Sequence, residues 1–575
     1  MSADFLFELG TEELPPKALR TLMTALRDSV AAGLEARDLA FEAITAYASP
    51  RRLAVKVEVL AEQTPIKEVI NWGPPARIAF DEAGEPTKAA QAFARKNGLT
   101  VEELTTEHDG KADKLVARAQ AGGEATTELL GAIMEQALAQ LPIAKRMRWG
   151  ASRAEFVRPA HWLVMLYGNE ILDAELLGLR ANRVTWGHRF HYNQELHLDQ
   201  PDDYLPKLKT TGHVLADMDE RRELIRTQVE TEADKAGGRA VIDEDLLDEV
   251  TALVEWPVAL LGQFEERFLA VPPEALIASM KEHQKYFHLV DPKGQLLPYF
   301  ITVANIESKD PAQVINGNER VIRPRLSDAA FFYETDLKHS LENRRTQLKS
   351  IVFQAKLGSV YDKTERIAKL SGQIAQALEV DPALAERAGR LCKSDLVSEM
   401  VLEFDNMQGI AGYYYARNDG EPEELAQAML EQYLPKFAGD ALPQTDTGVI
   451  IALADRLDTI TGIFGIGQQP TGSKDPFALR RASLGVLRLL VDKALDLDLR
   501  QLLEQAAAQH GELSHAEGLV DRVLAYMLER FRAWYEDKGL PVEVFQAVNA
   551  RGVTCPLDID LRVRAVHDFY QLPQA

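Results

Sequence analysis

Arginines and tryptophans gather between Lys145 and Tyr192, in a chain that is acidic on average. This stretch holds eight Lys and Arg residues against four Asp and Glu residues, with three tryptophans between them. Guanidinium groups bind phosphates through paired hydrogen bonds, and aromatic rings stack on unpaired bases, so the mixture suits an RNA surface. The candidate RNA contacts are Arg146, Arg148, Arg158 and Arg189. The alternative is structural, because arginines often tie loops to carboxylates or carbonyls and a tryptophan more often fills a core.

A second basic segment follows the glycine-rich loop 462–473. Asp475 followed by Pro476 predicts a helix start, because Asp is a good N-cap and Pro fits the first turn. Lys474, Arg481 and Arg488 recur every seven residues and would lie along one helical face. With Arg480 they are candidate phosphate contacts, since helix N-termini attract anions. The alternative is an ordinary solvated face.

The helical second half contains the residue order of an HD-type phosphohydrolase, in which a His, a His-Asp pair and a later Asp bind metal. Lys363 stands where the first His would be, Ser394-Asp395 replaces His-Asp, and Asp455 fills the last position. A cation at Lys363 would repel a metal, and two carboxylates alone are a poor site for a transition metal. We therefore expect a degenerate HD-type domain that binds no metal, with an ion pair between Lys363 and Asp395 or Asp455.

Composition limits the partners of the chain. Its 575 residues carry a formal net charge of −23, so the average surface repels nucleic acid and anionic membranes, and any RNA must bind a local basic patch. The two cysteines are too few for a disulfide framework. The N-terminal segment has neither the sequence of a signal peptide nor that of a transit peptide, and no stretch is long and apolar enough for a membrane span. We expect a cytoplasmic protein that contacts neither membrane nor DNA.

These candidate residues must be positioned by two kinds of architecture. Residues 5–9 and 43–60 have strand patterns, and residues 17–36, 125–141 and 219–236 have helical spacing. From about residue 328 long helical periods dominate. The sequence predicts a multi-domain protein whose α+β N-terminal half precedes a mainly α-helical half, with the joint near 317–336, where Gly317, Asn318 and Pro324 interrupt the pattern. The expected domains are 1–325, which contains two subdomains, the HD-like domain 326–500, and a helical segment 501–575.

Several longer strings together closely resemble the β subunit of bacterial heterotetrameric glycyl-tRNA synthetases. They follow the order of that family from the first predicted strand to about residue 570. The strings are 7–16 (FELGTEELPP), 49–53 (SPRRL), 147–150 (MRWG), 156–159 (FVRP), 187–190 (GHRF), 305–308 (NIES), 317–326 (GNERVIRPRL) and 474–481 (KDPFALRR).

The resemblance implies a subunit of an α2β2 glycine-tRNA ligase. In that family the separate α subunit carries the active site that uses ATP and Mg²⁺ to activate glycine, and the β subunit binds tRNA and is needed for aminoacylation. The candidate arginines and lysines then become candidate tRNA(Gly) contacts, and we expect neither a catalytic residue nor a cofactor on this chain. Family members usually continue into a helical anticodon-binding domain, which the resemblance predicts to be absent here. Two alternatives stay open: a stand-alone HD-type nucleotide phosphohydrolase, and an RNA-binding protein outside any enzyme.

Overall fold

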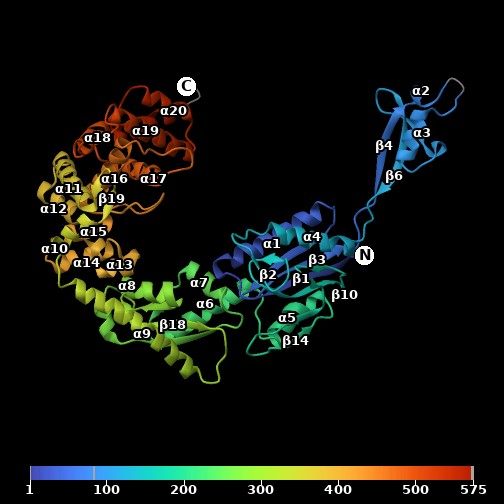
Figure 1. Cartoon of the computed structure of the whole chain (residues 1–575), viewed down its shortest axis with the longest axis horizontal. Helices are drawn as coiled ribbons and strands as arrows, with labels where there is room; N and C mark the ends of the chain where they lie inside the picture. The colour runs from blue at the N-terminus through green and yellow to red at the C-terminus, as the bar shows by residue number, and fades with distance from the viewer. Residues whose placement is uncertain (1, 82–83, 572–575) are drawn as a thin grey trace. The chain divides into compact units, whose positions relative to one another are not determined.

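The computed structural model of the chain describes residues 2–81 and 84–571, coloured along the sequence in Figure 1. The fold separates into two compact units. Unit 1 comprises Met1–Gln263 and Lys285–Glu319, and unit 2 comprises Phe264–Gln284 and Arg320–Ala575. Unit 1 contains sheets covered by helices, whereas unit 2 is mainly helical, so the described residues confirm the expected change from α+β to α along the chain.

Unit 1 is built on an antiparallel five-stranded sheet with strand order β10-β9-β1-β3-β2. Its strands are β1 (Ser2–Thr11), β2 (Ala43–Ser49), β3 (Arg52–Ala61), β9 (Ala160–Tyr167) and β10 (Glu170–Ile171). Side chains alternate between the two faces of a strand, and both faces of β1 are buried. The sheet is therefore the middle layer of a three-layer arrangement.

Different elements cover the two faces of this sheet (Figure 1). Phe5, Phe7 and Leu9 of β1 pack in one core with α1 (Leu19–Glu35) and α4 (Thr126–Gln140). Leu6 and Trp162 lie in the other core, which includes side chains of β14 (Glu195–His197) and α5 (Tyr204–Thr210). The apolar side chains of α1 recur at Leu19, Leu22, Leu26, Val30 and Leu34, and all are buried. This spacing is the one that the sequence predicts for a helix with one apolar face.

A glycine permits the close approach of strands β1 and β9. A Cβ atom on Gly10 would lie 1.8 Å from Cε2 of Trp162, well inside van der Waals contact. Gly10 belongs to the string 7–16, so at least part of that string is required by packing.

Unit 1 also contains a three-stranded and a four-stranded sheet, besides short two-stranded ones. The strands β4 (Lys67–Pro75), β6 (Asp113–Ala121) and β5 (Thr105–His108) form an antiparallel sheet in the order β4-β6-β5, accompanied by α2 (Ala76–Ala79) and α3 (Lys88–Lys96). A four-stranded sheet has the order β15-β17-β18-β16, with bounds β15 (Arg239–Ala240), β16 (Val258–Gln263), β17 (Phe287–Val290) and β18 (Leu296–Ala304). Helices α6 (Met218–Lys235) and α7 (Glu244–Thr251) share its core.

Short elements connect these layers. They are η1 (Pro16–Ala18), η2 (Val101–Glu103), β7 (Met147–Arg148), β8 (Glu155–Phe156), β11 (Glu175–Leu176), β12 (Leu179–Arg180), β13 (Val184–Trp186) and η3 (Pro201–Asp203).

Unit 2 is a set of packed helices around α16, whose side chains are buried along most of its length. The helices are α8 (Pro273–Ala278), α10 (Leu341–Arg345), α11 (Val360–Ala377), α12 (Pro382–Leu391), α13 (Glu399–Glu403), α14 (Ile410–Asn418), α15 (Glu423–Glu431), α16 (Asp446–Gly465), α17 (Leu479–Asp492), α18 (Leu499–Ala508), α19 (Leu519–Asp537), α20 (Val542–Asn549) and α21 (Pro556–Tyr570). Its shorter elements are η4 (Glu266–Ala270), the π-helix η5 (Ser279–His283), η6 (Thr346–Ser350), β19 (Val352–Gln354), β20 (Gly358–Ser359), η7 (Ser394–Val397) and η8 (Asp405–Met407).

The expected joint has a different structure. One continuous helix, α9 (Pro311–Asp336), runs through Gly317, Asn318 and Pro324, and the division between the units falls inside it, after Glu319. A proline removes one backbone hydrogen bond but does not prevent the flanking turns from staying helical. Residues 264–284 group with the helical unit. Helix α18 crosses residue 501, the expected start of the last segment, and contacts α16.

Across residues 2–81 and 84–571, no helix has the length and apolar character required to cross a bilayer.

Candidate functional site

The structure places Arg146 and Arg148 beside a short hairpin of unit 1 formed by β7 and β8. The guanidinium of Arg148 forms an ion pair with Glu155 across the hairpin, at 2.5 Å. Arg146 donates a hydrogen bond to the carbonyl of Ala139 at the end of α4, at 3.0 Å. Both arginines therefore have a structural partner within the chain.

Arg158 and Arg189 both contact the segment that follows β1. Arg158 donates to the carbonyl of Glu13 at 3.0 Å. Arg189 forms ion pairs with the carboxylates of Glu12 and Glu13, each at 2.9 Å. These arginines thus tie distant parts of the chain together, and the tryptophans of the stretch lie in or against the cores, with Trp162 8% exposed.

The second basic segment does not form the predicted stripe. Helix α17 begins at Leu479 rather than after Asp475, so Lys474 lies outside the helix. The carboxylate of Asp475 accepts hydrogen bonds from the backbone N–H groups of Leu479 and Arg480, at 2.8 and 3.0 Å. Asp475 therefore does cap the start of α17, but across a non-helical turn. Its negative charge lies at the helix N-terminus, the position that a phosphate would take.

The four cations of this segment differ in their partners. Arg488 is held by Asp492 at 3.4 Å and by the carbonyl of Asp440 at 3.0 Å, and Arg480 donates to the carbonyl of Gly472. Lys474 and Arg481 are exposed, and neither side chain has a hydrogen bond or ion pair with any residue that the structure describes. Of the eight candidate contacts, these two have their charged groups available to a ligand.

The four HD-type positions lie close together on α11, η7 and α16. The ammonium of Lys363 lies 2.8 Å from Oδ1 of Asp455 and 3.0 Å from Oδ2 of Asp458. A second ammonium, that of Lys393, lies 2.9 Å from the other carboxylate oxygen of Asp455. Burial opposes ionisation of Asp455, but the charges of the two lysines outweigh it and hold its pKa well below the usual range.

Asp395 has a different environment from Asp455. It is 1% exposed, and its carboxylate accepts a hydrogen bond from the backbone N–H of Gly409 at 2.6 Å. Burial raises its pKa to about 6. The neighbouring Ser394 hydroxyl is buried and has no hydrogen-bond partner among the described residues. Within the same residues, no cluster of three or more His, Cys, Asp or Glu side chains has the arrangement of a metal site.

Sequence reasoning missed three members of this cluster. Lys393, Arg366 and Asp458 are buried, and Arg366 forms an ion pair with Asp458 at 2.6 Å. The sequence did contain one signal for this cluster. Lys363 and Arg366 are three residues apart on α11, and Asp455 and Asp458 are three apart on α16, so each helix presents two like charges on one face. Two such faces of opposite sign predict contact between the helices.

Unit 1 contains a second buried network of ion pairs, which the sequence did not predict. Arg52 is fully buried and lies 3.2 Å from Glu255 and 3.5 Å from Glu8. Ser49 donates to Glu255 at 2.7 Å, and Thr185 donates to Glu8 at 2.5 Å. Burial alone would raise the pKa of Glu255, but the charge of Arg52, the hydrogen bond from Ser49 and the nearby charges of His188 and Arg51 together lower it. The network joins β1 and β3 to the connections around β13 and β16.

Asn305 extends this network to the end of β18. Its side-chain oxygen accepts hydrogen bonds from the backbone N–H groups of Glu255 and Trp256, at 2.7 and 3.1 Å. His188 lies 3.2 Å from the same oxygen. Residues from four of the strings, 7–16, 49–53, 187–190 and 305–308, therefore meet in one enclosed network, which gives those strings a structural role.

The comparisons with known proteins cover nearly the whole chain. A family model described as "Glycyl-tRNA synthetase beta subunit" matches residues 5–550. A protein of Chromohalobacter salexigens named "Glycine–tRNA ligase beta subunit" is 60% identical over 574 residues, which are 100% of this chain and 83% of the relative. Proteins with the same name from Hahella chejuensis and Marinobacter nauticus are each 57% identical, and the alignments cover 100% of this chain and 82% of each relative. The chain belongs to the glycyl-tRNA synthetase beta subunit family.

Proposed function

We propose that this chain is the tRNA-binding β subunit of a glycine-tRNA ligase, and that it acts with a separate α subunit to attach glycine to tRNA(Gly) in the cytoplasm. The observation that carries the proposal is the 60% identity to a glycine-tRNA ligase β subunit across the full length of the chain. In this division of labour, ATP and Mg²⁺ bind the α subunit, with an α2β2 stoichiometry, and this chain supplies contacts to tRNA.

The cations that lack a partner define a smaller set of candidate tRNA contacts than the eight predicted from the sequence. Among the eight candidates, Lys474 and Arg481 combine exposure with the lack of a partner among the described residues, whereas the other six guanidinium groups bind carboxylates or carbonyls of the chain. A phosphate can be bound by a free cation without breaking an existing ion pair. We propose Lys474 and Arg481 as the phosphate contacts of this segment.

The helical unit, in this proposal, contains an HD-type arrangement that has lost its metal chemistry. The ammonium groups of Lys363 and Lys393 contact both oxygens of Asp455, so this carboxylate is already neutralised. A divalent cation there would have to displace two positive charges. Elemental analysis of tag-free protein should find less than stoichiometric zinc, manganese and iron, and a full equivalent of any of them would contradict this part.

Assembly and RNA binding can each be tested directly. The purified chain should co-elute with a glycyl-tRNA synthetase α subunit in size-exclusion chromatography. It should also bind tRNA(Gly) with an affinity that falls as salt is raised. If the chain neither co-elutes with the α subunit nor binds tRNA(Gly), the proposed function is wrong.

A double variant tests the two proposed contacts. Lys474→Ala with Arg481→Ala should weaken tRNA binding and reduce the slope of log affinity against log salt by about two units, one for each phosphate contact. The matched control is Lys369→Ala with Arg551→Ala, which removes two exposed cations elsewhere in unit 2. Equal losses in both variants would show a general charge effect and overturn this assignment.

A further inference from the structure

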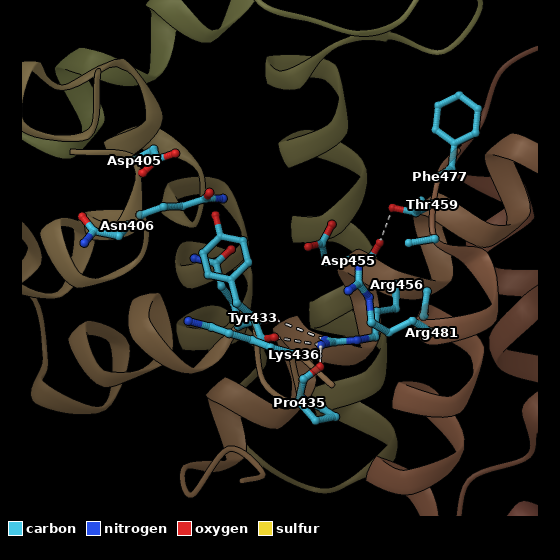
Figure 2. A pocket seen from close by; sticks show the side chains of 14 residues that line it. Asp405, Asn406, Tyr433, Pro435, Lys436, Asp455, Arg456, Thr459, Phe477 and Arg481 are labelled. Carbon is cyan, nitrogen blue, oxygen red and sulfur yellow. Dashed lines mark hydrogen bonds between the residues drawn. The ribbon is translucent and has the colours of Figure 1, made fainter. Parts of the chain in front are cut away.

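Unit 2 contains a cavity of about 450 Å³ bordered by the cluster around Asp455. Figure 2 shows its walls, which come from η8, the turn after α15, the middle of α16 and the start of α17. The volume lies within the range of small-molecule sites in proteins. The proposed tRNA role uses one residue of its wall, Arg481, and assigns no ligand to the cavity itself.

Positive charge exceeds negative charge around the cavity. Lys436, Arg456 and Arg481 line it together with two carboxylates, Asp405 and Asp455. The charge of Asp455 is already matched by the two ammonium groups behind it. Lys436 and Arg481 are exposed, and neither side chain has a hydrogen bond or ion pair with the part of the chain that the structure describes. In a protein with a net charge of −23, this arrangement favours an anion.

Arg456 gives the cavity a rigid positive wall. Its guanidinium donates to the carbonyls of Tyr433 and Pro435, at 3.1 and 3.0 Å (Figure 2), and to the carbonyl of Ala452 at 2.8 Å. Carbonyl partners hold the side chain in place without neutralising its charge, so the field of Arg456 acts on whatever occupies the cavity.

A buried acceptor without a donor also lines the cavity. Gln432 is 1% exposed, and its side-chain N–H group donates to the carbonyls of Cys392 and Met429. Its side-chain oxygen has no hydrogen-bond partner among the described residues. Leaving a buried acceptor unpaired is costly, so this atom points to a ligand that donates a hydrogen bond. The ligand should therefore combine an anionic group with a hydroxyl or amino group.

We propose that this cavity binds a nucleoside monophosphate unit. Lys436 and Arg481 bind the phosphate, and the charge of Arg456 attracts it from the cavity wall. The oxygen of Gln432 accepts a hydrogen bond from an amino or hydroxyl group of the nucleoside. Asn406 and Gln408 line the same cavity and add amide groups that can bind base or ribose, and Phe477 adds an aromatic ring. The step is binding alone, with no bond made or broken. The unit is either a free nucleotide or one nucleotide residue of an RNA strand.

Calorimetry on the full-length chain tests this proposal without the α subunit or tRNA, so its failure is separate from failure of the tRNA role. The probes are AMP, adenosine, inorganic phosphate and a short single-stranded RNA. We expect AMP or the RNA to bind more tightly than adenosine or phosphate. Lys436→Ala with Arg481→Ala should weaken that binding by about tenfold or more, because each lost contact is a charge-assisted hydrogen bond. The control Lys369→Ala with Arg551→Ala should bind as the unmodified chain does.

Each outcome of the calorimetry either supports or overturns the proposed nucleotide site. Binding of AMP that the cavity variant weakens, and the control does not, supports a free nucleotide as the ligand. Binding of the RNA alone, with the same pattern among the variants, supports a nucleotide residue of RNA. The proposal is overturned if neither probe binds, if adenosine binds as well as AMP, or if the cavity variant and the control lose affinity equally. The substituted side chains are exposed, and unchanged melting temperatures will verify that both variants are folded.

Discussion

Each unit buries a network of ion pairs, and the two networks differ in their surroundings. In unit 1, Arg52, Glu8 and Glu255 are each at most 2% exposed, and their remaining polar partners are side chains and carbonyls of the same unit. In unit 2, Asp455 keeps 18% of its side-chain surface exposed and lines a cavity. Enclosed charges can only stabilise an arrangement of strands, whereas charges beside a cavity can also act on a ligand.

The sequence strings that resemble the family also fall into two groups, according to the part of the fold to which they contribute. The strings that contain Glu8, Arg52, His188 and Asn305 supply the enclosed network, so their residue types are required by folding. The string 474–481 instead supplies Lys474, with its free cationic group, and Phe477 and Arg481 of the cavity wall. The strings of unit 1 thus have a structural role, whereas the string 474–481 supplies side chains that our proposals assign to a ligand.

The largest effect should come from breaking the enclosed network. Arg52→Met leaves Glu8 and Glu255 buried without their cation, which should lower the free energy of unfolding by about 3–5 kcal/mol. Calorimetry or denaturant unfolding would measure the loss. The control is Arg27→Met, because Arg27 pairs with Asp28 at the surface and should contribute less than about 1 kcal/mol. Equal stability of the two variants would contradict the comparison.

A smaller loss should follow Lys363→Met in unit 2. Asp455 keeps Lys393 and Asp458 keeps Arg366 after this change. The loss should therefore lie near or below the lower end, about 3 kcal/mol, of the range for a broken buried pair. Lys369→Met is a matched control, because Lys369 lies on the same helix and is exposed. A loss for Lys363→Met larger than that for Arg52→Met would reverse the comparison.

The smallest expected effect on the free energy of unfolding comes from Asp395, and it depends on pH. Its pKa rises from 3.8 to about 6 on folding, so the folded state binds a proton more tightly than the unfolded state. This carboxyl therefore favours folding most below about pH 4 and loses that contribution as pH rises to about 6. Asp395→Asn should be more stable than the unmodified chain above pH 6, by about 1–3 kcal/mol, and should lose this advantage near pH 4.

Unfolding curves at several pH values test this prediction. The quantity to compare is the difference in stability between Asp395→Asn and the unmodified chain, because other groups titrate equally in both proteins. A difference that does not change between pH 4 and pH 7 would mean that Asp395 titrates normally.

The sequence predicted local elements better than it predicted partners. The strand pattern of residues 43–60 and the helical spacing of 17–36 correspond to β2, β3 and α1, because residues close in the chain determine periodicity. Turn signals were less reliable. Gly317 and Pro324 lie inside a helix, and the helix expected after Asp475 begins at Leu479. A glycine and a proline can each be accommodated inside a long helix, and the hydrogen bonds of Asp475 span a turn before α17 begins.

Partners were missed because they lie far apart in the sequence. Arg158 binds the carbonyl of Glu13, 145 positions away, and Lys393 pairs with Asp455, 62 positions away. Sequence reasoning identified both Arg146, from local composition, and Arg481, from its place after a glycine-rich loop, as candidate RNA contacts. Only the fold distinguishes the first, which is tied to α4, from the second, which faces a cavity.

The most direct test of the proposed function is tRNA charging with separated subunits. Attachment of radioactive glycine to tRNA(Gly) would be measured with the α subunit alone, with this chain alone and with both together. We predict charging when both are present and none with either alone. An equal rate with the α subunit alone, or no charging by the mixture, would contradict the assignment of this chain as the β subunit that completes the ligase.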